Sequence, residues 1–242
     1  MFFIKSAFSE ITDFDSRLLK SLKLILTRPG EITKQYNNGV RTTYFPPIKL
    51  YLIISLILFV TLNLFEFTVT SNDRGGSFDY DAYVQPNVPI SFYFDVDADE
   101  SAEYREKLDF LALRMKDVNQ GYVNAISQAM FLLLPFFAIY LNLLLKDKKR
   151  TLAHYLIYAL HFHIFIFFIG IVLLIFHQII ASELWALVAW VAYFGYLILS
   201  LKKAFELKWG RTLVTSIAVT FLHFASFIYV QEVIKTYVVM SM

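Results

Sequence analysis

Histidines inside apolar segments are the residues of this sequence with the clearest chemical capacity. His161 and His163 lie within the aromatic run AHYLIYALHFHIFIF, and His223 lies in an apolar block closer to the C-terminus. Imidazoles on two helices can ligate haem or a metal ion, relay protons or contact a phosphate group. They can also hydrogen-bond a hydroxyl or a backbone carbonyl and serve only helix packing. Ionisable groups are costly in hydrocarbon, so these histidines are the first candidates for function.

Helical spacing divides these histidines into two directions. His154, Tyr158 and His161 recur at i, i+4 and i+7 and so form one stripe, whereas His163 points about 200° away from His161. At about 1.5 Å per residue, His161 lies roughly 12 Å and His223 roughly 16 Å from the cytoplasmic ends of their helices. We expect His161 and His223 to meet if their helices are neighbours. The candidate intramembrane polar site therefore comprises His154, Tyr158, His161, His163 and His223.

A second candidate site is an acidic run with the ligand spacing of a calcium loop. Positions 1, 3, 5, 7, 9 and 12 of such a loop correspond to Asp95, Asp97, Asp99, Ser101, Glu103 and Glu106. Two features depart from the pattern, since Glu100 stands where the turn needs glycine and the preceding segment is typical of extended chain. The alternative is that these acids cap and charge-stabilise the start of the following helix.

Basic side chains follow one side of residues 16–27, SRLLKSLKLILT. Leu18, Leu19, Leu22, Ile25 and Leu26 share one helical face. Arg17, Lys20 and Lys23 lie toward another face, which is typical of an interfacial helix on a leaflet containing anionic lipids. Together with Arg28 these bases are the candidate lipid-headgroup contacts. Pro29 and Gly39 predict the start and the end of the next helix.

Long apolar blocks must position these residues. The chain is 57% hydrophobic and only 17% charged, outside the usual range of soluble domains. Four blocks approach the roughly 20 residues that a crossing requires, namely 48–65, 123–145, 155–176 and 213–230. A fifth, 184–201, has no charge and follows the third after a short polar stretch, which predicts an antiparallel hairpin. We therefore expect an all-α integral membrane protein with about five transmembrane helices.

The charges between these blocks alternate in sign and predict an orientation. Residues 1–50 contain eight Lys or Arg against four Asp or Glu, and 146–150 and 202–211 are also basic. Residues 71–122 contain eleven acids against five bases. The positive-inside rule then places the N-terminus in the cytoplasm and the acidic segment outside. With five crossings, the C-terminus is extracytoplasmic.

This orientation predicts four regions. Residues 1–47 form basic amphipathic interfacial helices on the cytoplasmic side, and 48–66 form the first transmembrane helix. Residues 67–122 form a small mixed α/β extracytoplasmic insertion, because strand-like and helical patterns follow each other there. Residues 123–242 contain transmembrane helices two to five.

The run from Arg17 to Phe59 resembles a bacterial membrane-protein family catalogued as domain of unknown function family 3667. In that family a leucine-rich basic helix is followed by RPG, by a Tyr-containing helix ending in Gly, and by a Tyr and Pro before a transmembrane helix. The stretch from Ala153 to Phe167 resembles a second hallmark, an aromatic helix with a His-x-His pair. Many relatives begin with a cysteine-based zinc ribbon, which this chain lacks because it has no Cys. The resemblance implies a multi-pass protein of the bacterial inner membrane and supplies no reaction.

Three classes of function agree with these observations. The first is a small transporter, channel or lipid-handling protein with a His-lined polar site. The second is an accessory or scaffold subunit, and the third is a membrane-embedded haem or metal enzyme. We expect the first, because the sequence has no soluble catalytic domain and its polar candidates lie within the apolar blocks; glycine phosphate loops, Gly-x-Ser-x-Gly elbows and zinc-protease His-Glu pairs are also absent. The expected partners are membrane lipids and a second copy or a membrane-complex subunit. Nucleic acid is not indicated at a net charge of +2, and calcium or haem are the cofactors considered.

Overall fold

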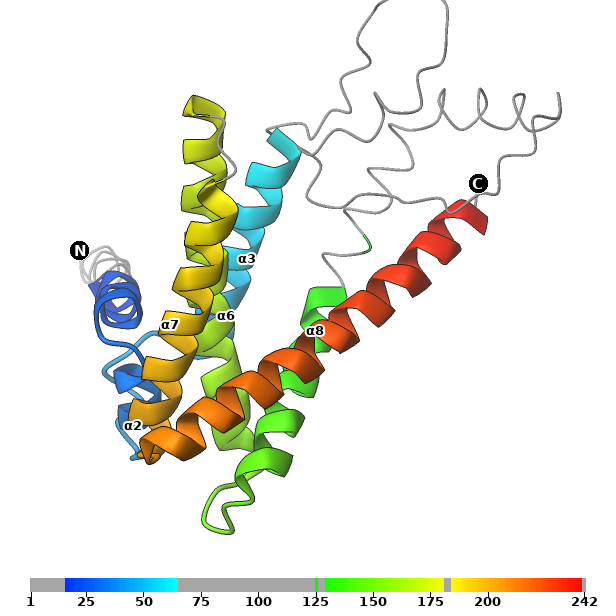
Figure 1. Ribbon diagram of the computed structural model, residues 1–242. Coiled ribbons are helices and arrows are strands. Elements are labelled where there is room, and N and C mark those ends of the chain that lie inside the picture. Colours follow the sequence, from blue (N-terminus) through cyan, green and yellow to red (C-terminus); the bar gives the residue numbers. More distant parts are fainter. Residues whose placement is uncertain (1–15, 65–124, 126–128, 181–183, 241–242) are drawn as a thin grey trace, which may run out of the picture. The chain divides into compact units, whose positions relative to one another are not determined.

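The structure is a computed structural model that describes residues 16–64, 125, 129–180 and 184–240. Within these ranges every regular element is a helix, as the sequence predicted. The helices are 16–27, α2 (Glu31–Asn37), α3 (Pro47–Leu64), Ala129–Leu145, α6 (Leu152–Ile179), α7 (Leu184–Phe205) and α8 (Trp209–Met240) (Figure 1). The predicted α/β insertion, 67–122, lies outside the described residues, and so do the candidate calcium ligands Asp95, Asp97, Asp99, Glu103 and Glu106.

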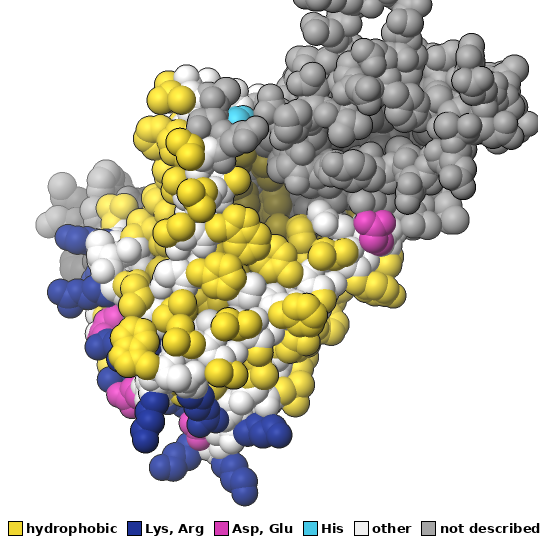
Figure 2. Space-filling model, in the orientation of Figure 1, with side chains coloured by type: hydrophobic (Ala, Val, Ile, Leu, Met, Phe, Trp, Pro, Cys, Tyr) yellow, Lys and Arg dark blue, Asp and Glu magenta, His cyan; other side chains and the backbone are white. Residues whose placement is uncertain are grey.

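Three of these helices are long and apolar enough to cross a membrane. They are α6, α7 and the Trp209–Ile234 part of α8. Two further apolar helices are shorter, Pro47–Leu62 within α3 and Ala129–Leu145. In Figure 2 hydrophobic side chains cover the sides of the helices, and Lys and Arg gather at the lower end. These features are those of a helical membrane protein.

The candidate site lies within one compact unit, which among the described residues comprises 16–61, 131–180 and 184–227. α6 supplies much of the core of this unit, with Tyr155, Tyr158 and Phe162 almost completely buried. α6 is apolar on nearly all sides, and its buried residues lie between Tyr155 and Phe167, where other helices pack against it.

α6 and α7 pack against each other in antiparallel directions. Phe176 of α6 contacts Trp185 near the start of α7, Phe165 stacks on Tyr196 with a centroid distance of 3.7 Å, and Tyr155 stacks on Phe205. Residues nearer the start of α6 therefore contact residues nearer the end of α7, as in an antiparallel pair. This is the hairpin that the short polar connection predicted.

The 16–27 helix packs on the rest of the chain through Ser21 and Ile25. Ser21 and Ile25 are fully buried, whereas Leu19 is 64% exposed. Ser21 is inside because its hydroxyl accepts a hydrogen bond from the backbone N–H of Phe45 at 2.9 Å and donates one to Arg17 O at 2.8 Å. This contact joins the helix to the chain that leads into α3. Leu19, on the predicted apolar face, stays exposed on the protein surface, where an interfacial helix would contact lipid.

α2 begins after Pro29 and Gly30 and is followed by Gly39, as the sequence predicted. Both glycines have positive φ, 78° at Gly30 and 94° at Gly39, a region that favours glycine. Gly30 is also in close contact with α7, since a Cβ there would lie 2.9 Å from the Cα of Ser200. The backbone of the Pro29-Gly30 turn therefore packs directly on the backbone of α7.

Candidate functional site

His163 and His223 form a pair of imidazoles between α6 and α8. Their ring centroids are 5.4 Å apart, and the rings meet at 75°. The ring of Phe137, on the Ala129–Leu145 helix, contacts both imidazoles edge to face, with an interplanar angle of 86° to each. The centroid distances are 5.4 Å to His163 and 5.0 Å to His223. Three helices therefore meet at this pair, and the ring of Phe137 fixes the position of both imidazoles.

The two imidazoles differ in their hydrogen bonds. His163 Nδ1 donates to the backbone carbonyl of Ala159 at 2.7 Å, one turn earlier in α6, so in the neutral ring Nε2 carries the lone pair. His223 Nδ1 is buried and has no hydrogen-bond partner among the described residues. An unsatisfied buried polar group costs about 1 to 3 kcal/mol. His163 is therefore anchored, whereas His223 retains a nitrogen that is available to a ligand or to water.

The residues that we call the polar seam extend from this pair along α8 and α7. The seam consists of Ser216, Thr220 and His223 on α8 and Tyr193 on α7. Each of the four has a buried side-chain polar atom; Ser216 Oγ and His223 Nδ1 have no hydrogen-bond partner in the described ranges, whereas the hydroxyls of Thr220 and Tyr193 interact with each other. The spacing of the three α8 residues, i, i+4 and i+7, places them on one helical face, and Tyr193 lies beside the Thr220 hydroxyl.

Several other Ser and Thr hydroxyls in the apolar helices are satisfied within their own helix. Thr61, Thr212 and Ser226 each donate to the carbonyl four residues earlier, at distances of 2.7 to 3.0 Å. This back-bonding is the usual way in which a helix satisfies a hydroxyl away from water. Ser216 and Thr220 have the same opportunity and do not use it. Buried polar atoms without a partner also occur elsewhere in the described residues, on Tyr51, Tyr155 and His161, but the polar seam gathers several buried polar side chains on α7 and α8.

The sequence did not lead us to Ser216, Thr220 or Tyr193. The signal was present, because Ser, Thr and His recur at i, i+4 and i+7 within an apolar block. The histidine pattern alone drew attention to α6. A search for all polar residues at helical spacing inside the blocks would have identified the α8 face.

His161 lies on the other side of α6. Its Nδ1 shares a hydrogen bond with Thr33 Oγ1 of α2 at 2.8 Å, and its ring meets that of Tyr36 at a centroid distance of 6.2 Å. His161 therefore does not contact His223 as we expected, and His163 contacts it instead. The angle of about 200° between the two α6 histidines explains the outcome, because only one of them can face α8.

The two remaining predicted residues, His154 and Tyr158, make contacts of other kinds. His154 Nδ1 accepts a hydrogen bond from the backbone N–H of Thr151 at 3.1 Å and so caps the start of α6. The Tyr158 hydroxyl bonds the Ser200 hydroxyl at 2.7 Å and joins α6 to α7. The five residues of the predicted site therefore occupy four separate environments, and only His163 and His223 lie together.

The His163 and His223 pair is a limited donor set for a metal ion. Within the described residues, no group of three or more His, Asp or Glu side chains lies close enough to hold one. Catalytic zinc sites use three protein ligands and structural sites use four. The two imidazoles fit hydrogen bonding and proton transfer better than they fit a complete metal centre.

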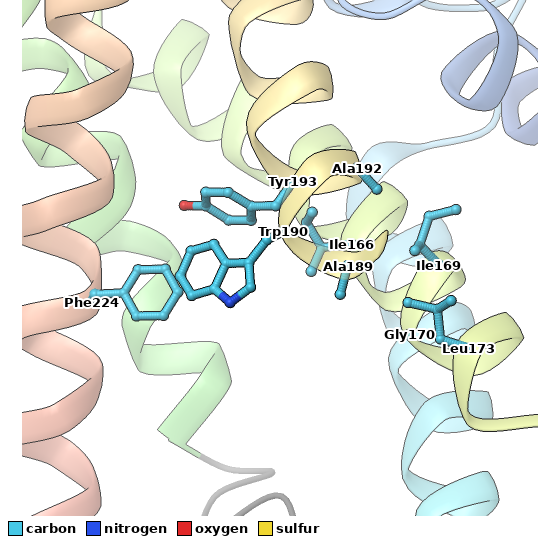
Figure 3. A pocket seen from close by; sticks show the side chains of 9 residues that line it. All are labelled: Ile166, Ile169, Gly170, Leu173, Ala189, Trp190, Ala192, Tyr193 and Phe224. Carbon is cyan, nitrogen blue, oxygen red and sulfur yellow. The ribbon is translucent and has the colours of Figure 1, made fainter. Parts of the chain in front are cut away.

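An apolar pocket of about 210 Å³ lies beside the polar seam (Figure 3). It is lined by α6 and α7 and by Phe224 of α8. Trp190 stacks on Phe224 with a centroid distance of 5.0 Å, and Tyr193 belongs both to the pocket and to the seam. Tyr193 lines the pocket and contributes its hydroxyl to the seam, so the pocket and the seam share one side chain.

The helices and this buried site define the class of the protein, a helical membrane protein. Residues 15–59 match the protein family described as "Protein of unknown function (DUF3667)". This match confirms the family that the residues Arg17 to Phe59 predicted. No curated protein and no solved structure matches the chain.

The matched segment contains the N-terminal contacts described above. It includes the 16–27 helix, α2 and most of α3, and its RPG motif is the turn of Arg28, Pro29 and Gly30 against α7. The buried contact of Gly30 accounts for the glycine of this motif. The histidine pair and the polar seam lie outside the matched segment.

Proposed function

We propose that this protein is a small transporter or channel in which protons, alone or together with a small polar solute, move along the polar seam. The observation that carries the proposal is the row of four buried polar side chains, Ser216, Thr220, Tyr193 and His223, that leads to His163, with Ser216 Oγ and His223 Nδ1 lacking a hydrogen-bond partner among the described residues. Unsatisfied groups in an apolar bundle are costly, and water or a solute that bonds them removes this cost. Imidazole is the side chain best suited to proton exchange near neutral pH.

The proposal includes five crossings of the bacterial inner membrane, with a cytoplasmic N-terminus and an extracytoplasmic C-terminus. In support, the two shorter apolar helices expose large apolar side chains, such as Leu56 at 64% and Leu132 at 56%. α3 has 18 residues, close to the length that a crossing requires. The basic connections 146–150 and 202–211 agree with the cytoplasmic side.

Flux measurements on the purified protein test this proposal. Full-length protein is reconstituted in liposomes that contain a pH-sensitive dye, and the decay of an imposed pH gradient is recorded. We expect faster decay than in empty liposomes, and we expect His163→Phe and His223→Phe each to abolish the difference. His177→Phe, the same change near the end of α6 and away from the seam, is the matched control and should retain the flux. Size-exclusion chromatography and circular dichroism establish that each variant is folded.

Two results would overturn the proposal. Protein-containing liposomes that behave like empty ones across pH 5 to 8 and a panel of small polar solutes would remove the transport function. A companion chain that repeatedly accompanies such inactive protein would then favour the accessory or scaffold subunit. Flux that is the same in His223→Phe and His177→Phe would show that the seam is not the path.

A further inference from the structure

A groove of about 650 Å³ lies at the basic end of α7, away from the polar seam. One wall is the segment that runs from Arg28 into α2, and the other is the end of α7 together with Trp209 at the start of α8. The groove thus brings the RPG motif together with residues near position 200. Neither the histidine pair nor the seam contributes to it.

The charges of this groove leave two cations available. Its walls carry four bases and two acids. Lys34 pairs with Glu206 at 2.6 Å, and Lys203 pairs with Glu31 at 3.1 Å. Both carboxylates are therefore engaged. Arg28 and Lys202 have no carboxylate partner among the described residues, so the groove offers two positive charges to an anion.

Apolar surface adjoins these cations. Leu199 is 50% exposed and Trp209 is 55% exposed, and both belong to the walls of the groove. The ammonium group of Lys202 lies 4.5 Å from the centroid of the Trp209 ring. Tryptophan with a neighbouring base is typical of the level at which a membrane helix meets the lipid headgroups. The groove therefore combines a site for an anion with a surface for an acyl chain.

We propose that this groove binds an anionic phospholipid, with Arg28 and Lys202 on the headgroup phosphate and Leu199 and Trp209 along the acyl chains. Guanidinium and ammonium groups are the usual protein ligands of phosphate. A free phosphate ion would use the cations and leave the apolar wall in water, whereas a phospholipid covers both. The charge and the apolar surface together favour the lipid. This site is independent of the proposed flux, because it shares no residue with the seam.

The site differs from the lipid contacts that the sequence predicted. Arg17, Lys20 and Lys23 lie on the 16–27 helix, and Lys20 is placed 5.6 Å from the centroid of the Tyr44 ring. Arg28 is the one predicted base that lines the groove. Lys202 and Trp209 join it from a part of the sequence more than 170 residues away.

Lipid binding to the full-length protein tests the site. Protein in mild detergent is titrated with dioleoylphosphatidylglycerol, and bound lipid is counted by native mass spectrometry. We expect the double variant Arg28→Gln, Lys202→Gln to weaken binding by about thirtyfold, because each base near a lipid headgroup contributes on the order of 1 kcal/mol. The control Lys148→Gln, Lys149→Gln removes the same charge from the basic connection before α6 and should bind as the native protein does. The single variant Lys202→Arg keeps the positive charge and should bind the lipid as the native protein does.

A second measurement reports on the apolar wall. Brominated phosphatidylglycerol quenches tryptophan fluorescence on contact, and we expect the Trp209→Phe variant to lose a large part of the quenching seen in the native protein. Titration with inorganic phosphate separates a lipid from a free ion. If inorganic phosphate raises the melting temperature of the protein as much as the lipid does, the proposal is overturned. Equal loss of lipid binding in the two double variants would also overturn it.

Discussion

Gly30 and Ser200 are in backbone contact, and no side chain larger than hydrogen fits between them. A Cβ at Gly30 would approach the carbonyl oxygen of Ser200 even more closely than its Cα, and it would lie 3.0 Å from Ala204 N. Ser200 in turn holds the hydroxyl of Tyr158 on α6. The RPG turn is therefore fixed to α7, and through α7 to the central helix of the bundle.

Gly30→Ala should destabilise the protein by about 2 to 4 kcal/mol, since it combines overpacking with left-handed backbone strain. Gly39→Ala is the matched control, because Gly39 also has positive φ but a methyl group added there would meet no described atom within 4 Å. Thermal unfolding in detergent compares the two. Equal losses in both variants would contradict the backbone contact as the cause.

Cysteine placed in the polar seam should react with water-soluble thiol reagents. The native chain has no Cys, so a single introduced thiol gives all of the signal. Labelling requires thiolate, which forms only where water reaches the sulfur. We expect Ser216→Cys and Thr220→Cys to be labelled in liposomes, and Val219→Cys, at a fully buried apolar position on the same helix, to remain unlabelled. Protection of all three would argue that the seam is dry.

The ion pair of Lys34 and Glu206 should make a pH-dependent contribution to stability. The hydrogen bond from Lys34 lowers the pKa of Glu206 below its ordinary value of 4.5, and the same bond raises the pKa of Lys34 above 10.5. A lowered pKa in the folded state means that the stabilisation is present above pH 4.5 and is lost as pH falls through the folded-state value.

Melting curves of native protein and Glu206→Gln between pH 7 and pH 3 measure this contribution. The native protein should melt at the higher temperature at pH 7, and the difference should shrink below pH 4.5. Both side chains reach solvent, so added salt should also reduce it. A difference that stays constant over this range would mean that another contact of Glu206 causes it.

Thr33→Val should destabilise the protein and leave flux unchanged. The substitution removes the hydroxyl that bonds His161 Nδ1 and leaves the buried imidazole without that partner, at a cost of about 1 to 3 kcal/mol. Thr33→Ser keeps the hydroxyl and should remain close to native stability. The comparison separates the role of His161, which joins α2 to α6, from that of the pair of His163 and His223. Loss of flux in folded Thr33→Val would place His161 on the path.

The sequence predicted where the helices lie much better than how each is rotated. The apolar blocks and the Pro29 and Gly39 signals located the elements because length and helix-boundary chemistry are local properties. α6, however, is apolar around nearly its whole circumference, so its sequence carries little information on which side faces which neighbour. The separation of His161 from His163 followed from helical geometry, but the assignment of His223 to one of them did not.

The same limit applies to contacts between distant segments. Ser21 is a polar residue on an otherwise apolar face, and its burial depends on the N–H of Phe45, which no local pattern indicates. The groove depends on the approach of Arg28 to Lys202 and Trp209. Such contacts arise from the packing of whole helices, and no local sequence pattern indicates them.

The contact of Gly30 with Ser200 also constrains the order in which the protein assembles. The N-terminal segment is synthesised first, yet its docking surface on α7 emerges from the ribosome about 170 residues later. Membrane helices insert individually before they associate. The RPG turn can therefore dock only after α7 has been synthesised and inserted, so its docking is a late step of assembly. A variant whose Gly30 is replaced would insert all of its helices, but its N-terminal segment would not dock on α7. That segment would then be accessible to quality-control proteases.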